Sequence, residues 1–279
     1  MFLQLNIKTP LKTSEKVEEV LYQADVLGWE TQEVGEFTNY LVYPKGQAQA
    51  EELLKVLSEI PEVEVSTTWI KEENWAEMWK KNFKPLKVGK RLIIAPPWEV
   101  PREVNSSEVL VVIEPGQAFG TGHHPTTQLM LKHIEEFASS SKPDLKVLDL
   151  GCGTAILSVA LLKLLPKAKV WAIDIDKDAL SAGMYNAKLN DLEDKIIFSE
   201  EIPLEKFDLI MANIGFRELK KLAEKITEVA NTNACAFLSG ILSEDKEKLL
   251  QVYTKLGWKL KKAEDLREWG FLWISRQSK

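Results

Sequence analysis

The sequence contains little cysteine and no long apolar segment. Its two cysteines, Cys152 and Cys235, are too few for a disulfide framework, which indicates a reducing compartment. A run of about 18 apolar residues, the length that a membrane-spanning helix needs, is absent from the sequence. The N-terminus also lacks the charged segment and apolar core of a secretion signal. We therefore expect a cytoplasmic protein with no membrane partner.

Basic residues are outnumbered by acidic ones. The 279 residues include 36 Lys and Arg against 42 Asp and Glu, so the net charge is −6. Proteins that bind the nucleic-acid backbone directly normally present a basic face, so we expect no direct contact with nucleic acid. The length suits one large domain with a smaller one, and we expect a monomer.

Residues 1–67 follow the order strand, helix, strand, strand, helix, strand. The segment "FLQLNI" alternates apolar and polar residues, whereas residues 14–27 and 48–60 repeat apolar residues at helical spacing. This order is typical of a ferredoxin-like α+β domain. Because residues 1–67 contain no cysteine, histidine or glycine-rich loop, we expect a recognition domain here rather than a catalytic one.

Residues 68–84 are expected to form a connector helix, and residues 85–279 a catalytic domain. Trp75, Trp79 and Phe83 recur at helical spacing within the connector. From Lys146 onward, continuous apolar strands alternate with helices, which predicts an α/β fold. The expected architecture is a mostly parallel, doubly wound sheet that ends in a C-terminal antiparallel hairpin.

The segment "VLDLGCGTA" ends the first of these strands and opens a helix. A dinucleotide-binding loop would carry a third glycine at position 156, where this chain has isoleucine. Asp149 would repel a pyrophosphate but would suit a positively charged cofactor such as S-adenosylmethionine. Gly151 and Gly153 would then let the backbone lie against the methionine part of that cofactor. A structural turn without a ligand is the alternative.

Two further strands end in polar side chains. Asp174 follows the apolar run in "AIDID", where an acid can accept both hydroxyls of a ribose. Asn213 follows the strand in "MANIGF" and offers a carbonyl oxygen that can accept a hydrogen bond from an amine. The competing roles are a helix-start acid for Asp174 and a helix N-cap for Asn213.

Together, the segments "EPGQAFGTGHHPTT", "DLGCGTAIL", "AIDID" and "ANI" resemble the PrmA family over essentially the whole chain. The resemblance implies a class I S-adenosylmethionine methyltransferase fold. It implies methylation of lysine side chains, and of the N-terminal amine, of large-subunit ribosomal protein eleven. It also implies that Thr126, Gly151, Asp174 and Asn213 contact the cofactor. One departure is Ala155, which replaces the third glycine of the family's loop.

The glycine-rich segment 114–127 is expected to be a flap over the cofactor. Glycines at 116, 120 and 122 permit unusual backbone dihedrals, Phe119 would cover the ligand, and Thr126 would hydrogen-bond it. We expect Phe119 and Asn213 to act in catalysis, Asn213 by orienting a neutral amine. No metal is expected, because the histidines of the flap are adjacent rather than at ligand spacing.

Three alternative functions are compatible with these patterns. One is a lysine methyltransferase of another protein, such as the electron-transfer flavoprotein β subunit. Another is a noncatalytic adenosine-ligand sensor or ribosome-assembly factor. The third is an oxidoreductase, which the isoleucine at position 156 and the acid at position 149 disfavour.

Overall fold

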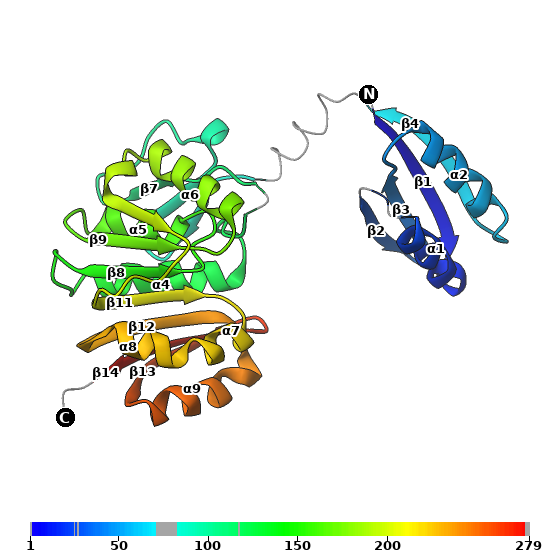
Figure 1. Ribbon diagram of the computed structural model, residues 1–279. Coiled ribbons are helices and arrows are strands. Elements are labelled where there is room, and N and C mark those ends of the chain that lie inside the picture. The colour runs from blue at the N-terminus through cyan, green and yellow to red at the C-terminus, as the bar shows by residue number, and fades with distance from the viewer. Residues whose placement is uncertain (1, 25, 27, 71–82, 117, 277–279) are drawn as a thin grey trace. The chain divides into compact units, whose positions relative to one another are not determined.

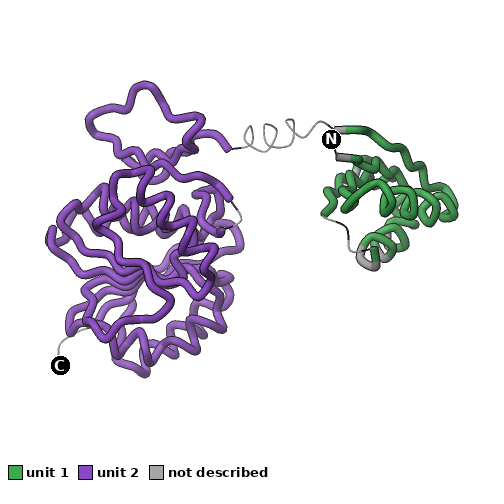
Figure 2. The backbone as a smooth tube through the Cα atoms, turned by 45° about the horizontal axis from the view of Figure 1, so that its top comes forward, with its two compact units in different colours: residues 1–82 green, residues 83–279 purple. Residues whose placement is uncertain are grey.

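The protein is described from a computed structural model, which covers residues 2–24, 26, 28–70, 83–116 and 118–276. The chain forms two compact units, Met1–Asn82 and Phe83–Lys279 (Figure 2). Most of the expected connector helix, with Trp75 and Trp79, lies outside the described residues. None of the helices within the described ranges is long and apolar enough to cross a membrane.

The first unit has the predicted ferredoxin-like order of elements. These are β1 (Phe2–Pro10), α1 (Leu11–Gln23), β2 (Gly28–Val34), β3 (Phe37–Tyr43), α2 (Gln47–Ser58) and β4 (Glu64–Ile70). The strands lie in the order β2-β3-β1-β4, and all neighbours are antiparallel. Strand β4 continues to Ile70, beyond the domain boundary expected at residue 67.

Alternation along the strands explains how this sheet acquires a core on one face. Leu5 and Ile7 of β1, and Tyr40 and Val42 of β3, are almost fully buried and pack with Leu53 of α2. The residues between them point to the other face, because successive side chains of a strand alternate. The helices therefore cover one face of the sheet.

The second unit contains the remaining elements (Figure 1). A small sheet comprises β5 (Leu86–Val88), β6 (Leu92–Ala95) and β7 (Val109–Val112). The large sheet comprises β8 (Lys146–Leu150), β9 (Lys169–Ile173), β10 (Ile196–Ser199), β11 (Phe207–Asn213), β12 (Ala230–Leu242), β13 (Trp258–Leu266) and β14 (Trp269–Arg276). The helices are α4 (Pro125–Ala138), α5 (Ile156–Leu164), α6 (Lys177–Leu189), α7 (Phe216–Lys221), α8 (Ala223–Val229) and α9 (Lys246–Lys255).

The large sheet confirms the predicted fold class. Its strand order is β10-β9-β8-β11-β12-β14-β13, and only the pairs that involve β14 are antiparallel. The C-terminal hairpin β13–β14 forms one edge, as expected. Strand order reverses between β8 and β11, and ligands of open α/β sheets bind at the carboxyl ends of the strands beside such a reversal.

Helices cover both faces of this sheet, and alternation decides which face each side chain meets. Val147 and Leu209 join the core beneath α4, α5 and α6, whereas Leu148 and Ile210 join the core beneath α7, α8 and α9. By the same alternation, Asp149 of β8 and Asn213 of β11 face the side of α4 and α5.

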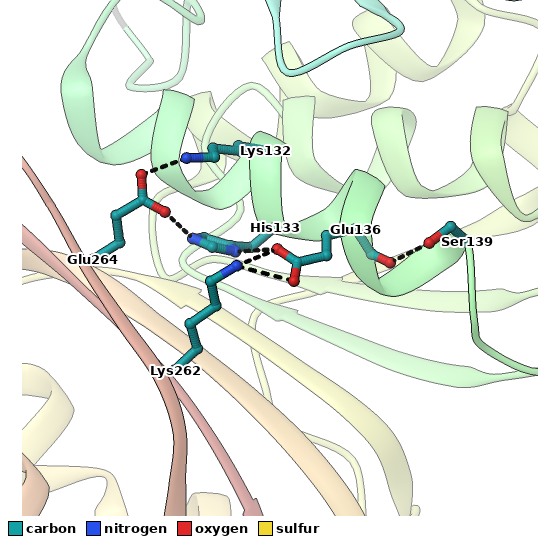
Figure 3. A network of polar contacts seen from close by, with 6 residues as sticks. All are labelled: Lys132, His133, Glu136, Ser139, Lys262 and Glu264. Atoms are coloured by element: carbon teal, nitrogen blue, oxygen red, sulfur yellow. Dashed lines mark hydrogen bonds and ion pairs between the residues drawn. The ribbon is translucent and has the colours of Figure 1, made fainter.

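A polar network fastens α4 to the hairpin (Figure 3). His133 is fully buried, and its ring stacks on Phe271 with centroids 4.1 Å apart. Its Nδ1 lies 3.2 Å from a carboxylate oxygen of Glu136, and its Nε2 lies 3.0 Å from one of Glu264. Lys262 of β13 pairs with Glu136 at 2.7 Å. This network fixes α4, whose first residues belong to the flap, against the sheet.

Candidate active site at the carboxyl edge of the sheet

A cavity of about 420 Å³ lies where β8, β9 and β11 end. Its lining brings together five residues that the sequence singled out: Phe119, Gly151, Gly153, Asp174 and Asn213. Thr126 and Asp149 are fully buried outside this lining.

The glycine loop after β8 needs both of its glycines for conformation and for packing. Gly151 and Gly153 have left-handed φ values of 72° and 52°. A Cβ on Gly151 would lie 2.3 Å from a methyl carbon of Ile214, and one on Gly153 would lie 2.2 Å from the carbonyl oxygen of Phe119. The following Ala155 is also left-handed, with φ of 60°, and glycine adopts that conformation at lower cost.

Asp149 lies beneath this loop, on the side of α5. Its Oδ2 accepts a hydrogen bond of 2.5 Å from the hydroxyl of Ser158. Its Oδ1 has no hydrogen-bond partner among the described residues. Burial raises the pKa of Asp149 to about 7, against the opposing effect of Ser158. A cation close to the free oxygen would favour the ionised carboxylate and lower this pKa.

Asp174 joins the two loops that border the cavity. Its Oδ2 accepts from the backbone N–H of Gly153 at 3.0 Å, and its Oδ1 accepts from that of Asp176 at 3.1 Å. The N-cap of α6 is Asp176, which accepts from the backbone N–H of Asp178 at 2.9 Å. The alternative role of helix cap therefore belongs to Asp176, and the carboxylate of Asp174 faces the cavity with lone pairs for further donors.

Asn213 ends β11 and presents an unpaired oxygen. Its Nδ2 approaches the hydroxyl of Thr127 on α4 at 3.5 Å, whereas its Oδ1 is buried and has no hydrogen-bond partner within the described part of the chain. The N-cap of α7 is Gly215, so Asn213 does not have the alternative role of capping that helix. The oxygen is available to accept a hydrogen bond from a ligand.

The flap lies against the glycine loop, and Phe119 is at its centre. The Phe119 side chain is 53% exposed at the cavity, and its ring meets His124 edge-on at 5.2 Å. Of the three flap glycines, Gly120 and Gly122 have left-handed φ values of 112° and 90°. Gly116 does not have a left-handed φ.

Thr126 begins α4 together with Pro125, which occupies the first helical position, where proline is favoured. The Thr126 hydroxyl shares a hydrogen bond of 2.7 Å with Nδ1 of His124, the N-cap residue. Burial lowers the pKa of His124, with Glu268 opposing, which favours the neutral imidazole. In this arrangement, the side chain of Thr126 holds His124 of the flap and does not line the cavity.

Several positions of the candidate site escaped the sequence analysis. Ile175, Ile214, Glu218 and Leu222 also line the cavity, and Thr154 holds the flap. Ile175 directly follows Asp174 and is 89% exposed, which is unusual for an apolar side chain in the middle of a folded unit. The pattern "AIDID" could have indicated this exposed position, because Ile175 lies after the strand and before the next helix and so belongs to the apolar face of neither.

The charge of the lining distinguishes between the two cofactors considered. Among the described residues, the lining contains the acids Asp174, Asp176 and Glu218 but no lysine or arginine. A diphosphate would meet only negative charge here, whereas a sulfonium with an α-ammonium group would be attracted. The unpaired oxygens of Asp149 and Asn213 are further acceptors for positive or N–H groups. These residues fit S-adenosylmethionine.

Comparison with known proteins agrees with this geometry. The family model described as ribosomal protein L11 methyltransferase (PrmA) matches residues 1–277. A protein of Geotalea uraniireducens named ribosomal protein L11 methyltransferase is 35% identical over 223 residues, which is 75% of this chain and 70% of the relative. One of the same name from Pelobacter propionicus is 40% identical over 194 residues, or 67% of this chain and 61% of the relative.

A solved structure gives the same result. The crystal structure of a ribosomal protein L11 methylase from Lactobacillus delbrueckii subsp. bulgaricus superposes with a TM-score of 0.64 and 32% identity. The match covers 70% of this chain and 100% of that one. Since the family model extends over nearly all residues, the chain belongs to the ribosomal protein L11 methyltransferase (PrmA) family.

Proposed function

We propose that this protein transfers methyl groups from S-adenosylmethionine to amines of ribosomal protein L11, chiefly lysine side chains. Membership of the family supports the substrate. The observation that carries the chemistry is the acidic cavity, in which the buried Oδ1 of Asn213 has no partner among the described residues. Such an oxygen can accept a hydrogen bond from an incoming amine.

Each polar group of the cavity has a role in this proposal. The backbone of Gly151 and Gly153 would lie against the methionine part of the cofactor, and Asp174 would accept the ribose hydroxyls. The free oxygen of Asp149 would attract the α-ammonium group from below the loop. Phe119 would cover the ligand and exclude water. When bound, the cofactor supplies a methyl group on a positively charged sulfur.

The substrate lysine must react as a neutral amine, because its ammonium form has no lone pair. The ordinary pKa of a lysine is near 10.4, so the site must favour loss of a proton. The apolar side chains of Phe119, Ile214 and Leu222 disfavour a charged amine by desolvation. Asn213 accepts one N–H of the amine and so aims its lone pair into the cavity. The proton leaves to solvent, and an amine held by one acceptor can rotate for further methylation.

The first unit is proposed to bind the substrate protein in the cytoplasm. Helices α1 and α2 cover one face of its sheet, and a groove lined by Asn6, Asn39, Leu41 and Ser66 lies on the other. Polar side chains beside an apolar one suit recognition of a protein surface. The ferredoxin-like unit also favours a protein substrate over the noncatalytic sensor and the oxidoreductase.

The test is mass spectrometry of purified ribosomal protein L11 after incubation with the protein and S-adenosylmethionine. We expect successive mass increments of one methyl group, and fragmentation should assign them to lysines. The Asn213→Ala variant should lose about 100-fold in kcat, the cost of a misplaced reactant. An unmodified substrate, or heat with NADH instead of S-adenosylhomocysteine, would overturn the proposal.

A further inference from the structure

The flap is held by a single residue of the glycine loop. The backbone N–H of Thr154 donates to the carbonyl oxygen of Phe119 at 3.0 Å. The hydroxyl of Thr154 donates to the carbonyl oxygen of Gly120 at 2.6 Å. Thr154 is fully buried, so neither bond competes with water. Thr154 thus binds two consecutive flap carbonyls beside the cavity, one through its backbone N–H and one through its hydroxyl.

A second residue joins Thr154 to the beginning of the flap. The side chain of Asn186 on α6 is 1% exposed, and its Nδ2 donates to the carbonyl oxygen of Thr154 at 3.1 Å. Its Oδ1 accepts from the backbone N–H of Glu114 at 2.8 Å. One turn later, Asn190 accepts from the N–H of Val112 at 3.0 Å and donates to its carbonyl at 2.6 Å. The two amides therefore fix β7 where it leads into the flap.

The fit between flap and loop leaves no room for added atoms. A Cβ on Gly153 would lie 2.2 Å from the carbonyl oxygen of Phe119, and one on Gly120 would lie 2.6 Å from the hydroxyl oxygen of Thr154. Both glycines are also left-handed. A larger residue at either glycine would therefore displace the flap from the position in which its two carbonyls accept hydrogen bonds from Thr154.

We propose that Thr154 is a positioning residue whose hydrogen bonds hold the flap and thereby set Phe119 over the cofactor cavity. Asn186 orients Thr154 by donating to its carbonyl oxygen. The two hydrogen bonds from Thr154 to the carbonyls of Phe119 and Gly120 are called the clasp. The inference rests on the proposed function for its ligand. Opening the flap costs the two hydrogen bonds that Thr154 donates to the carbonyl oxygens of Phe119 and Gly120. The clasp therefore governs how firmly the cofactor is retained and how readily its product leaves.

The test compares Thr154→Val with Thr154→Ser. Valine keeps the size and the backbone N–H but removes the hydroxyl, whereas serine keeps the hydroxyl. We expect Thr154→Val to weaken S-adenosylhomocysteine binding and raise KM for S-adenosylmethionine about tenfold, as loss of one buried hydrogen bond implies, with a smaller change in kcat. Thr154→Ser should restore both values to within a small factor of the wild type.

A second readout needs neither ligand nor activity. In the ligand-free protein, hydrogen exchange of peptides that cover residues 118–124 should be faster in Thr154→Val than in the wild type, and normal in Thr154→Ser. Exchange in β8 and β11 should not change. If Thr154→Val does not fold, Thr154→Ala makes the same comparison without the added methyl group.

The outcomes separate this inference from the proposed function. Wild-type protein that neither binds S-adenosylhomocysteine nor methylates would defeat the proposed function, while the exchange comparison would still test the clasp. If the wild type is active but hydrogen exchange of residues 118–124 is the same in Thr154→Val as in the wild type, the inference about Thr154 fails and the proposed function stands. Faster exchange throughout residues 83–279, without a specific effect on the flap, would show that Thr154 is merely structural.

Discussion

Replacing Gly153 by alanine tests the close contact between the glycine loop and the flap. The φ of Gly153 is 52°, in the region where an L-residue costs about 1–2 kcal/mol. The new Cβ would also lie 2.2 Å from the carbonyl oxygen of Phe119, which must therefore move. That movement breaks the 3.0 Å bond from the N–H of Thr154, worth about 0.5–1.5 kcal/mol. The expected cost is about 2–3 kcal/mol in total.

The assay is thermal unfolding of the full chain, followed by calorimetry with S-adenosylhomocysteine. For a unit of this size, about 2–4 °C is lost per kcal/mol, so the Tm of the Gly153→Ala variant should fall by about 4–12 °C. Its affinity should fall as well, because the flap is displaced. Gly116→Ala is the matched control, since its Cβ would meet nothing within 4 Å and its φ is not left-handed.

The reasoning would be refuted if Gly153→Ala had the Tm and affinity of the wild type, because the flap carbonyl could then not lie where the structure places it. An equal loss in Gly116→Ala would also contradict it, since that result would mean that any alanine in this region is harmful.

Two further predictions concern buried titratable groups. Burial raises the pKa of Asp149 from 3.8 to about 7, so the folded state binds the proton more tightly, and stability should fall as pH rises from about 4 to 7. The slope approaches about 1.4 kcal/mol per pH unit, and thermal unfolding of Asp149→Asn across this range should show a flatter profile; parallel profiles would contradict the assignment. His133→Ala should destabilise the fold by about 3 kcal/mol through loss of its buried stacking, measured by thermal unfolding, with unchanged affinity for S-adenosylhomocysteine. Lys262→Ala, which removes a partly exposed ion pair of the same network, should cost less than about 1 kcal/mol; equal losses in the two variants would show that the buried ring is not the stabilising element.

Much of the fold was predictable because the local patterns are strong. Residues 146–150 and 258–266, whose sequences predict strands, form β8 and β13. The sequence of residues 217–230 predicts a single helix, but the chain forms two, α7 and α8, on either side of Leu222. The small sheet β5–β7 escaped prediction because its strands are three or four residues long, too short to establish a period.

The candidate site was only partly predictable. Gly151, Gly153, Asp174 and Asn213 follow strands of a parallel sheet, and such positions converge at one edge. The role of Thr154 could not be predicted, because it depends on a bond to a carbonyl 34 residues away. Nothing in its neighbours along the chain indicates that its hydroxyl binds a distant carbonyl.

The sequence by itself determined most of the elements, the edge of the sheet where the candidate site lies, and the acid at the end of β9, since these depend on periodicity, glycine dihedrals and residue type. Tertiary structure decided which groups share the cavity and which lie behind it. Asp149 and Thr126 are buried outside the lining, whereas Ile175 and Glu218 belong to it. The reason is physical: whether a side chain reaches a cavity depends on what packs against it from distant parts of the chain.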